Sequence, residues 1–254
     1  MDCARHKEEI LQGPCFSAVP TAVGSFPHTD AHNLVDRIFS RFTEMPVWPQ
    51  LPVRDWLESM YVQYSEGLPG AVVDRKEQRI FFRCDSDFQA GLERFYQAVI
   101  EEDVERFAMT PDYALGLNLF LDALSRQGER RKWVKGQVTG PFSFAMTVTD
   151  EEKRSIAYNP ELYEVAVQGL AMKARWMARR LKQAADNAVV VLDEPYLCSF
   201  GSAFVNVPRS DVMAAIEGAV EAIHKEGALA GPPSRARGGS RPGCARTRSP
   251  CPRS

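Results

Sequence analysis

The chain has 254 residues, of which 44% are hydrophobic and 25% are charged, and its formal net charge is −2. This length suits one large α/β domain or two small ones, and the composition is ordinary for a protein that buries a core. No apolar run is long enough to span a bilayer, and the N-terminus lacks the apolar segment of a signal peptide. We therefore expect a cytoplasmic protein with no membrane partner.

The charge is distributed unevenly along the chain. Residues 231–254 hold six arginines and no acidic residue, whereas the remaining residues hold 25 basic and 33 acidic side chains and carry about −8. An acidic body argues against nucleic acid as a partner. The six cysteines form no Cys-x-x-Cys pair and no regular framework, which indicates reduced thiols.

The N-terminal quarter of the chain predicts the start of an alternating β/α pattern. Residues 1–17 form a short leader of mixed polarity, and residues 18–26 read as a first strand. Asp30 is placed to cap a helix with one apolar face. Residues 45–51 are short, apolar and interrupted by proline, and they read as a second strand.

The next stretch predicts an interruption of the pattern by surface elements. A helix is expected to carry Leu57, Met60, Tyr61 and Tyr64 on one face. Residues 71–84 then offer two short extended runs with charged residues between them, so we expect a surface hairpin. Further helices are expected to open at Ser86 and at Thr110, which precedes a first-turn proline.

The rest of the body predicts three more strands, at 133–139, 188–192 and 228–230. The run at 188–192 is apolar without alternation, which is typical of a strand buried on both faces of a parallel sheet. Helices starting at Asn159-Pro160 and at a Ser210 cap separate these strands. Strands that alternate with helices predict parallel βα units.

These elements indicate an α/β fold of the (β/α)8 TIM-barrel type. A closed eight-stranded barrel needs about 250 residues, and part of this chain goes to extra helices and a hairpin. We therefore expect residues 18–230 to form an incomplete barrel with about five βα units.

Residues 231–254 break the pattern abruptly. They contain no acid, no lysine and no aliphatic residue larger than alanine, and such a segment is expected to be disordered. Arginine with proline, glycine and serine is what GC-rich DNA yields when it is read in a wrong frame. We expect a frameshifted or misassembled end and hence a C-terminally truncated barrel. The alternative is a genuine basic tail that binds an anionic surface.

Three strand ends carry residues suited to chemistry. Gly24 lets a ligand approach the backbone closely, and Ser25 offers a hydroxyl and an N–H to an anionic group. The second end is the run from Gln137 to Ser143, and the third is the acidic pair Asp193-Glu194 after a buried strand. The carboxyl ends of parallel strands form the ligand-binding edge of α/β folds. The alternative for the acidic pair is a turn acid that caps the next helix.

In this order and spacing, the segments Thr21 to Pro27, Val138 to Pro141 and Leu192 to Pro195 resemble the catalytic domain of cobalamin-independent methionine synthase. That family belongs to the uroporphyrinogen decarboxylase/methionine synthase superfamily of (β/α)8 barrels, and the resemblance covers about Pro20 to Gly231. The family transfers a methyl group from a folate or other carrier to a thiol, usually homocysteine. The resemblance implies a methyltransferase of methionine biosynthesis whose partners are a small-molecule thiol and a methyl donor.

The resemblance also implies roles for individual residues. Gly24 and Ser25 would meet the carboxylate of the amino-acid substrate, and Asp193, with Glu194 beside it, would bind the ammonium group. Gln63 stands where methionine synthases carry a second ammonium-binding glutamate. We expect these five residues to bind substrate, and the departure at Gln63 leaves the identity of the thiol acceptor open.

The resemblance implies zinc for the full-length family, because zinc converts a thiol that is mostly protonated at neutral pH into a thiolate. The family's ligands are a His-x-Cys pair after the strand that follows Asp-Glu-Pro, then a Glu and a further Cys. Here Pro232-Pro233 stands where that pair should begin, and no histidine follows His224. We expect the zinc ligands to be absent, Cys244 and Cys251 not to replace them, Cys198 to be a buried structural thiol, and the chain to be inactive or nearly so.

Two other functions remain open. One is a metal-free decarboxylase of the same superfamily, which would act on a tetrapyrrole through acidic and arginine side chains at the barrel mouth, with Arg54 and Arg83 as possible contacts. The other is a non-catalytic binding protein whose basic tail is genuine.

Overall fold

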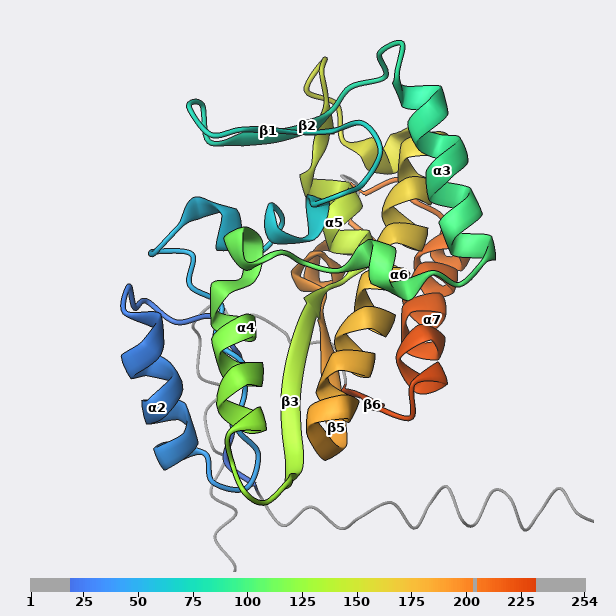
Figure 1. Ribbon diagram of the computed structural model, residues 1–254. Coiled ribbons are helices and arrows are strands. Elements are labelled where there is room, and N and C mark those ends of the chain that lie inside the picture. Colours follow the sequence, from blue (N-terminus) through green and yellow to red (C-terminus); the bar gives the residue numbers. More distant parts are fainter. Residues whose placement is uncertain (1–18, 203–204, 232–254) are drawn as a thin grey trace, which may run out of the picture.

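A parallel sheet with helices packed along it forms the centre of the molecule (Figure 1). The computed structural model describes residues 19–202 and 205–231. The leader predicted at 1–17 and, apart from Gly231, the tail predicted to be disordered lie outside these residues. The described part of the chain is a mixed α/β structure, and none of its helices is long and apolar enough to cross a membrane.

The order of the central strands follows the order of the chain. Strands β3 (Arg131–Thr139), β5 (Ala185–Asp193) and β6 (Leu229–Gly231) pair in parallel in that order. On the other side of β3, isolated parallel bridges join Val47 to Lys135 and Ser25 to Gln50. The strands predicted at 18–26 and 45–51 are therefore wrong for the described residues, which make only these single bridges there. Each crossover therefore steps to the next neighbour in one direction, whereas doubly wound sheets reverse direction. Within the described residues the sheet does not close into a barrel.

Local signals in the sequence position most of the helices. Asp30 accepts a hydrogen bond from the backbone N–H of Asn33, which confirms the predicted cap. The helix start predicted at Asn159-Pro160 is also confirmed, and there Asn159 accepts two hydrogen bonds from the first turn. The cap predicted at Ser210 is wrong, because that helix already begins at Arg209. The helices are α2 (Ala31–Arg41), α3 (Phe88–Ile100), α4 (Pro111–Ser125), α5 (Pro141–Thr147), α6 (Pro160–Ala184) and α7 (Arg209–Lys225).

The helix expected to carry Leu57 and Tyr64 does not form. The structure has two 3-10 turns there, η1 (Trp56–Glu58) and η2 (Gln63–Ser65), and Ser59 between them is extended with φ −72° and ψ 151°. The segment is attached to the end of β3 instead. The Thr139 hydroxyl donates to the Met60 carbonyl at 2.7 Å, and the Tyr64 hydroxyl donates to the Gln137 carbonyl at 2.6 Å.

The predicted surface hairpin is confirmed. Strands β1 (Ala71–Asp74) and β2 (Arg79–Phe82) are antiparallel, and β4 (Thr149–Asp150) extends them in parallel beside β2. This small sheet lies beyond the carboxyl ends of β3 and β5, at the top of Figure 1. Neither β4 nor α5 was expected from the sequence.

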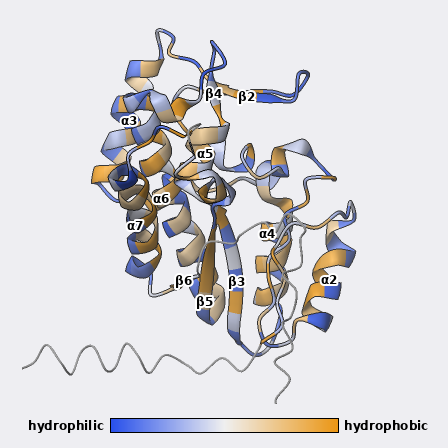
Figure 2. Cartoon of the chain, turned by 180° about the vertical axis from the view of Figure 1, so that it is seen from behind, coloured by the Kyte–Doolittle hydropathy of each residue, from blue (hydrophilic) through white to orange (hydrophobic). Residues whose placement is uncertain are grey.

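The two faces of β5 differ in burial. Ala188, Val190 and Leu192 are fully buried against the helices, whereas Val189 and Val191 on the other face are half-buried. Figure 2 shows the apolar character of β5 from the side opposite to Figure 1. The expectation of a strand buried on both faces is therefore met on one face only, because the described sheet is open on the other.

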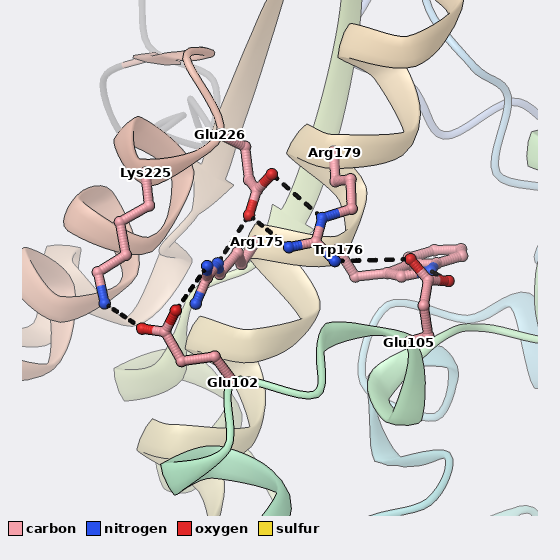
Figure 3. Close-up of polar contacts among 7 residues, drawn as sticks. All are labelled: Glu102, Glu105, Arg175, Trp176, Arg179, Lys225 and Glu226. Atoms are coloured by element: carbon pink, nitrogen blue, oxygen red, sulfur yellow. Dashed lines mark hydrogen bonds and ion pairs between the residues drawn. The ribbon is translucent and has the colours of Figure 1, made fainter.

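An ion-pair network joins α6 to the ends of α3 and α7 (Figure 3). Arg175 of α6 binds Glu226 at 2.7 Å and Glu102 at 3.0 Å, and Arg179 binds Glu226 at 2.9 Å. Lys225 also binds Glu102, at 2.9 Å. Hydrogen bonds from Arg175 and Lys225 lower the pKa of Glu102 to about 2. Those from Arg179 and Arg175 also lower the pKa of Glu226.

Replacing the shared carboxylate should destabilise the fold. We expect Glu226→Gln to lower the free energy of unfolding by about 1–3 kcal/mol at pH 7, since it removes the negative charge that two partly buried arginines share. Glu221→Gln, at an exposed position of the same helix, is the matched control and should change it by less than about 0.5 kcal/mol. Both are measured by urea denaturation.

The same network predicts a pH dependence. The folded pKa of both carboxylates lies below the unfolded value, so their contribution is fully present above about pH 4.5 and is lost as the pH falls towards 2. The difference between wild type and Glu226→Gln should therefore shrink over this range. A difference that is constant from pH 6 to pH 2.5 would show that the charges do not carry it.

Lys173 of α6 is a second unusual charge, because its side chain is 0% exposed. Among residues 19–202 and 205–231, its ammonium donates only to the Phe107 carbonyl, at 3.4 Å. Burial lowers the pKa of Lys173 to about 8, and the carboxylate of Glu66 opposes this in part. A buried charge with one weak partner is unfavourable for folding.

Removing this charge should stabilise the protein. We expect Lys173→Met to raise the free energy of unfolding by about 2 kcal/mol at pH 7, and Lys132→Met at an exposed site to leave it within about 0.5 kcal/mol. Because the folded pKa lies below that of the unfolded chain, wild type should gain stability as the pH rises from 8 towards 10.5. Lys173→Met should gain less stability over that range. If the free energy of unfolding rises equally with pH in both proteins, measured by denaturation at each pH, Lys173 is not the group responsible.

Candidate functional site

The inner face of the sheet carries a line of polar side chains. Gly136 of β3 lies against Leu181 and Met177 of α6. Its neighbours Lys135 and Gln137 therefore point to the other face. The register sets Thr139 of β3 opposite Asp193 of β5, so two of the three strand ends that the sequence singled out lie side by side. The third, at Gly24-Ser25, is bridged to Gln50, and the segment of Gln50 is in turn bridged to β3 through Val47.

Gly24 is a close-contact position, but a side chain of the protein makes the contact. Its φ is +129°, and a Cβ atom there would lie 2.1 Å from Nε2 of Gln137. Gln137 also donates to the Trp48 carbonyl at 3.2 Å. The missing Cβ of Gly24 thus accommodates the Gln137 amide, where the sequence had predicted close approach of a ligand.

Ser25 lies beside this contact and is exposed. The pairing with Gln50 uses the carbonyl of Gly24 and the N–H of Phe26, and it leaves the N–H of Ser25 out. Within the described residues the Ser25 hydroxyl makes no hydrogen bond. Ser25 therefore offers two donors at this end of the sheet, as the sequence predicted for an anion-binding residue.

The acidic pair is divided between two faces. Asp193 shares the inner face with Val191 and Val189, and its carbonyl accepts a hydrogen bond from Gly140 at 2.9 Å. Glu194 is 2% exposed, and its carboxylate accepts from the backbone N–H groups of Phe142 at 3.1 Å and Ser143 at 2.8 Å.

Glu194 therefore caps the N-terminus of α5, a helix that precedes it in the chain. The alternative of an acid that caps the next helix is not met at Glu194, whose side chain makes no cap hydrogen bond to the following turn η5 (Pro195–Ser199). Burial raises the pKa of Glu194, and the hydrogen bonds from Ser143 and Phe142 oppose this. The carboxylate of Asp193 also raises that pKa. In this structure Glu194 positions a helix beside the site and does not face its interior.

Gln63 is 0% exposed, and both ends of its amide have partners in the protein. Its Oε1 accepts from Gln50 at 2.7 Å, and its Nε2 donates to the Tyr113 carbonyl at 2.6 Å. Gln63 therefore links α4 to the extended segment that pairs with Ser25. The structure brings Gly24, Ser25 and Asp193 to one end of the sheet, and places Gln63 behind that surface.

Sequence reasoning missed Lys135, and it gave no individual role to Gln137, the first residue of the second strand end. Both are buried on the inner face, and Lys135 donates from Nζ to the Val23 carbonyl at 2.8 Å. A signal was available, because lysine, glutamine and threonine alternate with apolar residues along 133–139. That period of two marks a strand with one polar face.

Negative charge at the site affects its tyrosines. Burial raises the pKa of Tyr61 and raises that of Tyr64 well above its usual value, and the carboxylate of Asp193 raises both further. Both phenols therefore remain protonated donors at neutral pH.

The described residues do not fit a zinc site. No group of three His, Cys, Asp or Glu side chains among them could hold a metal ion. Cys84 and Cys198 are both exposed, so the expectation that Cys198 is buried is wrong. Cys244 and Cys251 lie outside the described residues.

The arginines proposed for a decarboxylase are bound elsewhere. Arg54 pairs with the buried Glu58, and Arg83 pairs with Glu151 at 2.9 Å and lies over the Phe81 ring. A cavity of about 1230 Å³ is lined by Arg130, Arg131 and Lys132, among others, at the amino ends of the strands. Ligand sites of parallel α/β folds lie at the opposite ends, so we place the candidate site at Ser25 and Asp193.

The chain was compared with protein-family models, curated proteins and solved structures, and none of them matches.

The contact between Gly24 and Gln137 makes a testable prediction. We expect Gly24→Ala to lower the free energy of unfolding by about 2 kcal/mol, because the new methyl group overlaps a buried amide and the positive φ is strained. Gly218→Ala, in α7 with nothing within 4 Å of its added Cβ, is the matched control and should stabilise by about 0.5–1 kcal/mol. Similar effects of the two substitutions in thermal denaturation would refute the contact.

Proposed function

We propose that residues 19–231 form about five β/α units of an incomplete barrel of the methionine synthase type, and that their inner face binds an α-amino acid. The observation that carries the proposal is the placement of Ser25, in a parallel bridge to Gln50, and of Asp193, the last residue of β5, at the same end of the parallel pairings. A hydroxyl and N–H donor suits a carboxylate, and a carboxylate suits an ammonium group. Together they complement the two charges of an amino acid.

The winding of the sheet supports the barrel. Parallel segments that are neighbours in chain order, each crossover stepping the same way, are the arrangement of the (β/α)8 fold. The short helix α5 and the 3-10 segment at 56–65 both lie at the carboxyl end of β3. Loops that follow strands at this end build the active sites of such barrels.

Methyl transfer is the activity of the family that the chain resembles. In that family zinc supplies the thiolate nucleophile, and the described residues offer no set of ligands for zinc. We therefore assign to this chain the amino-acid-binding part of the reaction: Ser25 takes the carboxylate, Asp193 takes the ammonium group, and Gln137 supports the turn at Gly24. No step of thiol activation is assigned to its side chains.

Titration with L-methionine, the product of the family's reaction, tests this proposal. The full chain should bind it with one-to-one stoichiometry in isothermal titration calorimetry. Asp193→Asn should weaken binding about tenfold or more, because it removes a charge-assisted contact. Asp186→Asn, at the other end of the same strand, should leave the affinity unchanged. Absence of binding by wild type, or equal affinity of both variants, would refute the proposal.

A further inference from the structure

A buried lysine lies directly behind the proposed carboxylate-binding turn. Lys135 is 7% exposed, and its ammonium donates to the carbonyl of Val23, the residue before Gly24-Ser25. Oε1 of Gln137 lies 3.5 Å from the same ammonium. Because the Gln137 amide nitrogen donates to the Trp48 carbonyl, its oxygen is the atom turned towards Lys135.

This ammonium has no close counter-charge in the described structure. Within residues 19–202 and 205–231, no carboxylate oxygen lies within 4 Å of Nζ. Asp193 acts on Lys135 from a greater distance and raises its pKa, while burial has the larger effect and lowers it to about 8. A buried charge without a close partner is costly unless another group neutralises it.

We propose that Lys135 supplies the positive charge of the carboxylate subsite, so that a ligand carboxylate at Ser25 is attracted to this ammonium. The proposal rests on the function proposed above for the identity of the ligand. Lys135 acts through the turn at Val23 and by its charge, and Ser25 makes the direct contact. With Lys135 at one end and Asp193 at the other, the inner face is electrostatically complementary to a zwitterion.

The opposite placement of the two charges gives specificity. A ligand without a carboxylate is not attracted by Lys135, and a ligand without an ammonium group is not attracted by Asp193, so each should bind more weakly than an amino acid. Lys135 is 7% exposed, so its charge acts from a region where the effective dielectric constant is lower than in water. Lys135 is thus a positioning and specificity residue for the carboxylate end of the ligand.

Three probes separate the two ends. L-Methionine carries both charges, L-methioninamide lacks the carboxylate, and 4-(methylthio)butanoate lacks the ammonium group. Each is titrated into wild type, Lys135→Gln and Lys135→Arg by calorimetry. Lys135→Gln should weaken the binding of L-methionine and of 4-(methylthio)butanoate about tenfold or more. It should change the affinity for L-methioninamide by less than about twofold. Lys135→Arg, which keeps the charge, should stay within about threefold of wild type for all three.

The pattern across the probes distinguishes charge from structure. An equal loss for L-methionine and L-methioninamide in Lys135→Gln would mean a structural role and would overturn the proposal. Thermal denaturation checks that the variants fold. If Lys135→Gln does not fold, Lys135→Met, which leaves no unpaired polar group, replaces it in the same titrations. Wild type gives a check without any variant, because it should prefer L-methionine to L-methioninamide by about tenfold or more.

The same data separate this inference from the proposed function. If wild type binds L-methionine and Lys135→Gln binds it equally well, the proposed role of Lys135 is wrong and the proposed amino-acid binding stands. Wild type that binds 4-(methylthio)butanoate as tightly as L-methionine, with loss in Lys135→Gln, overturns the ammonium site and supports the role of Lys135. Wild type that binds none of the three probes overturns both.

Discussion

The parallel pairing of β3 with β5 is the constraint on which the rest of the structure depends. Its register sets Thr139 opposite Asp193 and Gln137 opposite Val191. Because side chains alternate between the two faces of a strand, this register decides which polar groups lie on the face away from α6. A shift of β3 by one residue would turn Lys135 and Gln137 into the apolar layer against α6.

Alternation also explains why an acidic pair at a strand end does two different tasks. Consecutive residues of an extended chain cannot face the same side. Asp193 therefore remains with the inner face, while Glu194 reaches the first turn of α5 and accepts two of its N–H groups. The helix cap holds the loop that follows β3 against the end of β5, so the second acid supports the position of the first.

Sequence alone predicted the elements whose causes are local. The cap at Asp30, the helix start at Asn159-Pro160 and the hairpin at 71–84 depend on neighbouring residues, and all three were found. The segment at 56–65 was predicted as a regular helix and is not one. Its decisive contacts are hydrogen bonds to β3 that span more than 70 residues of chain, and no local pattern encodes them.

For the candidate site, too, the sequence predicted the features with local causes and missed those that depend on distant contacts. Motifs at strand ends identified Gly24, Ser25 and Asp193, because the position of a strand end follows from the run before it. The reason for Gly24 did not follow, since the group that fills its missing Cβ is Gln137 from a different strand. The partners of Gln63 were equally hidden, because Gln50 and Tyr113 come from separate elements.

The two buried lysines show how position separates a structural charge from a functional one. Burial lowers the pKa of both to about 8, so desolvation alone does not distinguish them. Lys173 lies on α6 and donates to a carbonyl of the η3 turn (Val104–Phe107), away from the strand ends. Lys135 lies on the inner face, bonded to the turn that carries Ser25 and within the field of Asp193. Our proposal of a ligand carboxylate at Ser25 therefore concerns Lys135 and not Lys173, because only the first of these two lysines is bonded to the turn that carries Ser25.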